Sequence, residues 1–89
     1  MGDYTPHQEQ YMMLRLPQLK EILGISRSSI YLQVGQGLLT QPISMGSRAI
    51  AWPKFEIMQI LAARIRGDDD FAIREVVLQL HKGRCQIFL

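Results

Sequence analysis

The chain has 89 residues, of which 47% are hydrophobic and 20% charged, with a formal net charge of +2. This size fits one small domain with one core, and the single cysteine, Cys85, excludes an internal disulfide. No apolar run approaches the ~20 residues of a membrane-spanning helix, and the first residues lack the apolar region of a secretory signal. We therefore expect a cytoplasmic protein, outside the membrane, whose slight positive charge permits an anionic partner.

The sequence contains no pattern typical of an enzyme. His7, His81 and Cys85 do not have the spacing of metal ligands, and the glycines form no phosphate-binding loop. The three aspartates at 68–70 could form a metal cluster or begin a helix, and the helical spacing of the residues after them favours the second interpretation. We expect no catalytic residue, no metal and no cofactor.

The first half of the chain predicts an arm followed by two short helices. Residues 1–13 show no periodicity and are interpreted as a flexible N-terminal arm. A helix should begin near Pro17, which is favoured in a first helical turn, and end at Gly24. Its apolar stripe comprises Leu16, Leu19, Ile22 and Leu23.

A second helix is predicted from Arg27 to Val34 or Gln36, with Ser26 as its N-cap. Ile30 and Val34 should face the core. The outer face then comprises Ser28, Leu32 and Gly35, with Ser29, Gln33 and Gln36 beside them. A solvated helix usually carries charges on this face, so a small, nearly uncharged face indicates close approach to a surface that offers hydrogen-bonding groups.

Two helices joined by a tight turn are typical of a helix-turn-helix, although a plain αα-corner has the same local pattern. Two β-prone runs follow, at 42–45 and 48–52, separated by Gly46-Ser47. This spacing predicts a hairpin with a two-residue turn, which would be a wing. Arg48 would begin the returning strand and could reach a phosphate or the minor groove, or remain a solvated arginine.

The second half predicts two longer helices. The first spans 53–66, and its inward residues are expected to be Phe55, Met58, Leu61, Ala62 and Ile65, with Ile57 and Ile60 widening the stripe. The second follows the aspartates and uses Ile73, Val76, Val77 and Leu80, while Phe71 and Leu78 point to another side. The apolar tail at 84–89 should pack on the domain or pair with another copy.

Residues 14–66 resemble the AlpA-like family of prophage regulators, which is related to small excisionases with winged helix-turn-helix folds. The resemblance rests on "LRLPQL", "LGISRSSIY", "MGSRAIAW" and "FEIMQIL", in the family's order and spacing. It implies a DNA-binding protein that acts on transcription, on site-specific excision, or on both. Leu32 stands where the family usually has arginine; it could meet a thymine methyl or mark a helix of lower affinity.

The sequence thus predicts a mainly α fold with a small two-stranded β wing (α+β), that is, a winged helix-turn-helix with an added C-terminal helix. Its parts are the arm at 1–13, the DNA-binding domain at 14–66, and the C-terminal helix and tail at 67–89. The predicted partner is double-stranded DNA, with further copies of the chain, an integrase or RNA polymerase as additional candidates. The alternative is a protein-interaction adaptor that no longer reads DNA. The expected DNA-contacting residues are Ser26, Arg27, Ser28, Ser29, Tyr31, Leu32, Gln33, Gln36 and Arg48.

Overall fold

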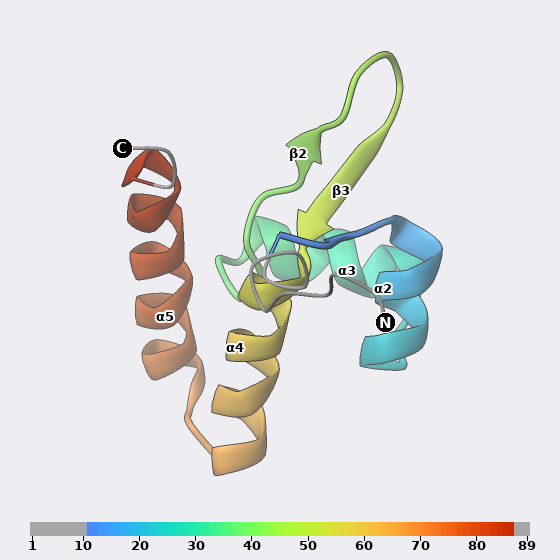
Figure 1. Ribbon diagram of the computed structural model, residues 1–89. Helices are drawn as coiled ribbons and strands as arrows, with labels where there is room; N and C mark the ends of the chain where they lie inside the picture. Colours follow the sequence, from blue (N-terminus) through green and yellow to red (C-terminus); the bar gives the residue numbers. More distant parts are fainter. Residues whose placement is uncertain (1–10, 87–89) are drawn as a thin grey trace, which may run out of the picture.

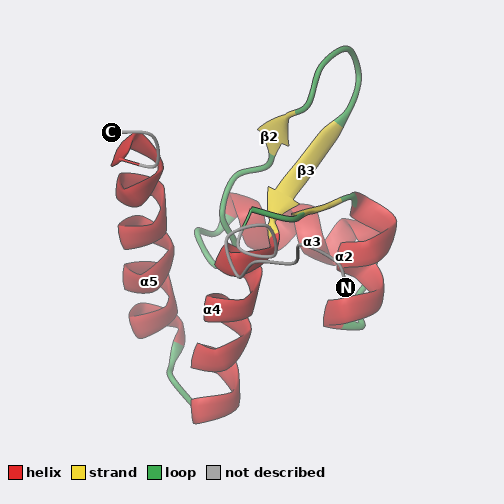
Figure 2. Ribbon diagram, viewed as in Figure 1, coloured by secondary structure: helices red, strands yellow, loops and turns green. Residues whose placement is uncertain are grey.

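The computed structural model describes residues 11–86 (Figure 1). Along the chain the elements are β1 (Met13–Leu14), α2 (Leu16–Leu23), α3 (Arg27–Gly35), β2 (Ile43–Ser44), β3 (Ile50–Pro53), α4 (Lys54–Arg66), α5 (Asp70–Gly83) and the 3₁₀ turn η1 (Arg84–Gln86). Figure 2 shows mostly helix with a small sheet, which confirms the predicted α+β winged helix-turn-helix class.

The helix ends follow the local signals of the sequence. Pro17 lies in the first turn of α2, and Gly24 ends that helix with a φ of 66° in the left-handed region, a conformation that costs glycine little. The Ser26 hydroxyl caps α3 by accepting the backbone N–H of Ser29 at 3.1 Å. Asp69 caps α5 in the same way through Ala72, at 2.9 Å, which confirms the helix-start interpretation of the aspartates.

The sheet has three strands in the order β1-β3-β2, and both pairings are antiparallel. The two-stranded wing was predicted, but β1 was not: Met13 pairs with Pro53, and Leu14 pairs with Trp52. The backbone carbonyl of Met12 also accepts the N–H of Lys54 at 2.7 Å. Met12 and Met13, which were expected to belong to a flexible arm, are therefore bonded to the domain, whereas residues 1–10 lie outside the described part.

The turn of the wing differs from the prediction. The backbone N–H of Met45 donates to the carbonyl of Ala49 at 2.8 Å, which closes a loop over Gly46, Ser47 and Arg48. Arg48 has a φ of 61°, the left-handed residue that often completes a three-residue hairpin loop. The prediction that Arg48 begins a strand is therefore wrong, because β3 starts at Ile50.

The core is centred on β3 and α4. Trp52 is fully buried, and its indole N–H donates to the carbonyl of Thr40 at 2.8 Å. The predicted inward face of α4 is partly wrong, since Ala62 is exposed and Ile65 is 79% exposed. The buried residues of this helix are Glu56, Ile57, Ile60 and Ala63. Apolar spacing misplaced the face because a carboxylate, Glu56, occupies part of it.

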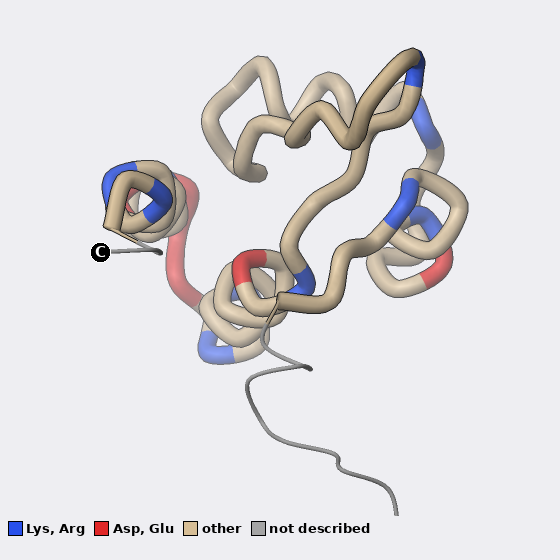
Figure 3. Tube along the Cα trace, turned by 45° about the horizontal axis from the view of Figure 1, so that its top comes forward, with Lys and Arg blue, Asp and Glu red and all other residues tan. Residues whose placement is uncertain are grey.

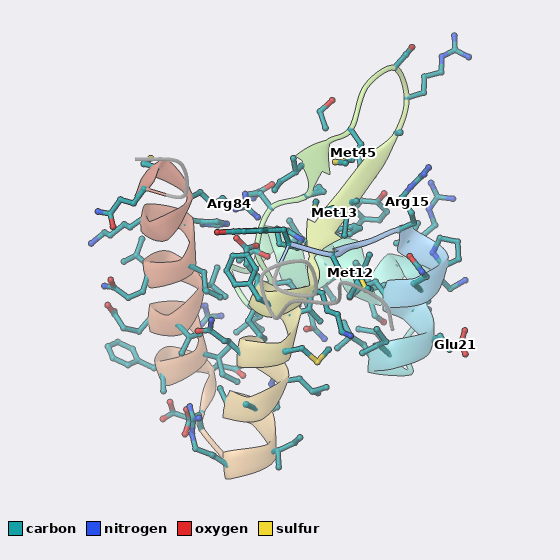
Figure 4. The ribbon with its side chains drawn as sticks, in the orientation of Figure 1. Met12, Met13, Arg15, Glu21, Met45 and Arg84 are labelled. Carbon is teal, nitrogen blue, oxygen red and sulfur yellow. The ribbon has the colours of Figure 1, made fainter. Side chains whose placement is uncertain are left out.

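Burial of Glu56 is made possible by Arg84 at the end of α5. Glu56 has no solvent exposure, and the Arg84 guanidinium donates to its two carboxylate oxygens at 2.7 and 2.8 Å. The same guanidinium donates to the backbone carbonyl of Gln41 at 2.7 Å. Figure 4 shows Arg84 reaching from α5 toward the base of the wing. The end of the last helix is thus bonded both to α4 and to the segment that enters the wing.

We predict that Arg84→Met lowers the free energy of unfolding by ~3 kcal/mol, because it leaves a buried carboxylate without its partner. Urea unfolding measures the change. The double variant Glu56→Gln, Arg84→Met should regain most of the loss. Arg66→Met is the matched control, since Arg66 pairs with Asp68 at 2.9 Å on the surface and such pairs contribute less than ~1 kcal/mol. A loss from Arg84→Met no larger than the control's would contradict this role.

The imidazole of His81 belongs to the same contact region. Its Nε2 accepts the backbone N–H of Gln41 at 3.0 Å, which requires the neutral ring. Burial lowers the pKa of His81 from its ordinary value of 6.5; the neighbouring Arg84 charge lowers it further, and Glu56 opposes both. The unfolded chain therefore takes up the proton first as the pH falls.

This order of protonation predicts a pH-dependent stability. The contribution of His81 is complete above pH 6.5 and is lost as the pH falls from 6.5 through the lower folded-state pKa. Urea unfolding measures the free energy of unfolding at pH values of about 7.5 and about 5.5. Between these values it should fall less for His81→Gln than for the intact chain, because the glutamine amide oxygen accepts the hydrogen bond at both. His7 is present in both proteins and cancels. Equal drops would rule out the effect.

Candidate nucleic-acid interface

The outer face of α3 lies open to solvent beside the wing. Leu32 is 60% exposed, Ser28 is exposed, and Gly35, exposed at the end of the helix, carries no side chain. The buried face of the helix carries Ile30, which has no exposure. The outward orientation of Leu32 predicted from the sequence is therefore confirmed, and the face remains free of charged groups.

Two serines at the start of α3 bond to each other. The Ser26 hydroxyl donates to the Ser29 hydroxyl at 3.0 Å while accepting the Ser29 backbone N–H. Ser26 is therefore used in capping the helix, whereas the Ser29 hydroxyl keeps its own proton for another acceptor. Ser28 forms neither of these bonds and projects from the first turn, where a groove-binding helix usually presents its reading groups.

One flank of α3 carries basic groups from three elements. A hollow of about 360 Å³ is lined by Arg15 at the start of α2, Arg27 of α3 and Arg48 at the tip of the wing, together with Leu16, Pro17, Tyr31 and Ile50. The Arg27 guanidinium lies 5.8 Å from the centre of the Tyr31 ring, a cation–π contact that restricts its position. The arrangement suits an anionic group held between helix and wing.

The opposite flank of α3 is different in character. Gln33 is half-buried and lines a hollow of about 300 Å³ with Leu23, Ile25, Leu39, Ile60, Leu61 and Arg64. Gln36 ends α3, and its carbonyl accepts the Arg74 guanidinium at 2.8 Å. The structure thus brings Arg27, Tyr31 and Arg48 together around one hollow, and it sets Gln33 on the other side of the helix.

Arg15 was not among the residues predicted to contact DNA. Its position depends on β1, because this strand pairs with β3 and Arg15, which follows it directly, therefore lies beside the wing. Figure 4 shows Arg15 beside the wing at the start of α2. The sequence offered only a weak signal, the apolar pair Met13-Leu14 two positions before the helix, and two residues are too few to indicate a strand by alternation.

Charge is unevenly distributed over the described residues. Figure 3 shows basic positions on the wing tip and on the helices beside it, and an acidic segment between α4 and α5. That segment is 68–70, at the start of α5.

In residues 11–86 no group of three or more His, Cys, Asp or Glu side chains could hold a metal ion. Within the same range no helix has the length and apolar character needed to cross a membrane.

The fold and this surface define a small winged helix-turn-helix protein. A sequence profile described as "Prophage CP4-57 regulatory protein (AlpA)" matches residues 12–65, more than half of the chain. The chain therefore belongs to the AlpA family of prophage regulatory proteins. It is also 34% identical over 62 residues to "Uncharacterized protein ORF88" of Enterobacteria phage P4, a match that covers 70% of each chain. No solved structure matches.

Proposed function

We propose that this phage or prophage regulator binds double-stranded DNA with sequence selectivity, placing the first turns of α3 in the major groove. The observation that carries the proposal is the hollow lined by Arg15, Arg27 and Arg48 beside an uncharged outer helix face. A helix fits the major groove, and guanidinium groups bind phosphate oxygens as two-pronged donors. The basic flank would hold the backbone while the outer face meets base edges.

The residues divide into two roles under this proposal. Arg15, Arg27 and Arg48 contact phosphates, and Tyr31 holds Arg27 in place. Ser28, Ser29 and Leu32 face the bases, with the Leu32 side chain against a thymine methyl. Ser26 acts through the helix cap. Gln33 and Gln36 would meet DNA only at the far edge of the face, because the Gln33 side chain lines the opposite hollow.

Within this class, the protein acts as a transcription regulator or as an excision factor, beside RNA polymerase or an integrase. Both activities use a small domain that marks or bends DNA next to an enzyme, so the fold does not separate them. We place its action in the cytoplasm, on the host nucleoid, and assign it no catalytic step of its own. Footprinting on the attachment and promoter regions of its own element distinguishes the two activities: protection at the attachment site indicates excision.

Each arginine of the basic flank should contribute to binding regardless of sequence. Arg15→Ala, Arg27→Ala and Arg48→Ala should each weaken binding to all duplexes and reduce the slope of log affinity against log salt by about one unit. Arg66→Ala, at the far end of α4, is the matched control. For Arg48, a loss confined to A·T-rich flanks would indicate insertion into a narrow minor groove. An unchanged slope for Arg15→Ala would remove that residue from the interface.

The outer face of α3 should control sequence choice. A best site is first selected from a random duplex library. The double variant Ser28→Ala, Leu32→Ala should then reduce the preference for that site over scrambled DNA about tenfold, or ~1.4 kcal/mol. Gln33→Ala, on the opposite flank, is the control and should leave the preference nearly unchanged. If the intact chain selects no site and its binding shows no salt dependence, the adaptor alternative replaces DNA reading.

A further inference from the structure

The outer face of α5 carries apolar side chains that the domain does not use. Phe71 is 80% exposed and Leu78 is 46% exposed, and both lie opposite the buried residues Ile73 and Val77. Exposed Glu75 and Lys82 continue the same line along the helix. These four residues recur at alternating intervals of four and three, the period of a helix that packs against one other helix.

This face is separate from the DNA-binding surface. Figure 1 shows α5 beside α4, on the side away from α2. The family profile matches residues 12–65, so α5 lies beyond the residues that this profile covers. The DNA-binding module therefore leaves this face uncovered.

The charges of the helix point to a second copy of itself. The three aspartates at 68–70 outnumber the two arginines of α4 that pair with them, Arg66 with Asp68 at 2.9 Å and Arg64 with Asp70 at 3.6 Å, so the start of α5 stays acidic, and Lys82 lies in its last turn. In an antiparallel pair, the acidic start of each helix lies near the basic end of the other. The two helix dipoles then run in opposite directions, which is favourable. A parallel pair would instead set Glu75 against Glu75 and Lys82 against Lys82. We propose that two copies pair through their α5 outer faces in an antiparallel, twofold-symmetric contact.

The contact is too small to hold a dimer in the absence of DNA. A stable protein interface buries about 1,200–2,000 Å², and a single helix line with two large apolar side chains presents much less than that. Two copies bound at neighbouring DNA sites have a high effective concentration relative to one another, which makes a weak contact sufficient. The pairing should therefore be detected as cooperative binding of two copies to neighbouring DNA sites.

The position of α5 relative to α3 is fixed by two arginines. Arg74 donates to the carbonyl of Gln36 at the end of α3, at 2.8 Å. Arg84 joins the other end of α5 to Glu56 and to the carbonyl of Gln41. A twofold contact between α5 helices thus sets the two α3 helices in a twofold relation. Such a pair reads inverted half-sites, as symmetric dimers of helix-turn-helix proteins do.

The inference rests on the proposed DNA binding, and the experiment separates the two. The variant Phe71→Glu, Leu78→Glu is compared with Ile65→Glu, which alters an apolar residue of α4 that is as exposed as Phe71. Affinity is measured on duplexes with one half-site, two inverted half-sites and two direct half-sites, using the site selected above. Thermal melting checks the fold, and sedimentation at high protein concentration follows pairing without DNA.

We expect the intact chain and Ile65→Glu to bind inverted half-sites with about 5–150-fold cooperativity. The α5 variant should lose this cooperativity but keep its affinity for one half-site and its melting temperature. Equal cooperativity in the α5 variant, the same loss in Ile65→Glu, or cooperativity on direct half-sites would overturn the pairing. If no variant binds a single half-site, DNA binding is wrong, and concentration-dependent sedimentation of the intact chain that the α5 variant lacks still supports the pairing.

Discussion

The arrangement of α4, α5 and the wing depends on the ion pair between Glu56 and Arg84, which lie 28 positions apart. Removing a carboxylate from water costs several kcal/mol unless its oxygens are bonded to a partner charge. Arg84 supplies both donors and stays 22% exposed at its own side chain, so the greater part of the desolvation falls on Glu56. Its third contact, with the Gln41 carbonyl, extends the constraint to the segment entering the wing.

Features that depend on neighbouring residues were predictable from the sequence. The caps at Ser26 and Asp69 and the glycine at the end of α2 are local, because each is determined by a hydrogen bond or a dihedral angle within a few residues. The order of the predicted helices and of the hairpin indicated the fold class. The exposure of Leu32 followed from helical periodicity alone.

Features that depend on distant partners were not predictable. The apolar stripe of α4 was misplaced because a charged residue, Glu56, faces inward to meet a residue at the end of the chain. The strand β1 is too short to show the alternation of apolar and polar residues that indicates a strand. It forms because its backbone pairs with the edge of β3. Arg15 was missed for the same reason, since β1 places it beside the wing. The three-residue turn depends on a left-handed arginine, which sequence preferences do not favour.

The central strand β3 connects these observations to function. It pairs with β1 on one side and with β2 on the other, so Arg15 and the wing tip are carried by neighbours of the same strand. The helix α3 contributes Arg27 to the same hollow. The basic surface is therefore assembled by the sheet and is not continuous in sequence, and it gathers three of the chain's ten Lys and Arg residues around one hollow.

The burial of residues from α5 has a consequence for synthesis of the protein. Ile73 and Val77 are part of the core, and Arg84 follows them near the end of the chain. While the ribosome still holds these residues, the apolar face of α4 lacks its cover and Glu56 lacks its partner. The helix-turn-helix can form its local turns during translation, but tertiary packing is completed only once α5 and Arg84 have left the ribosome. The regulator therefore reaches its folded form only after the segment through Arg84 has been synthesised.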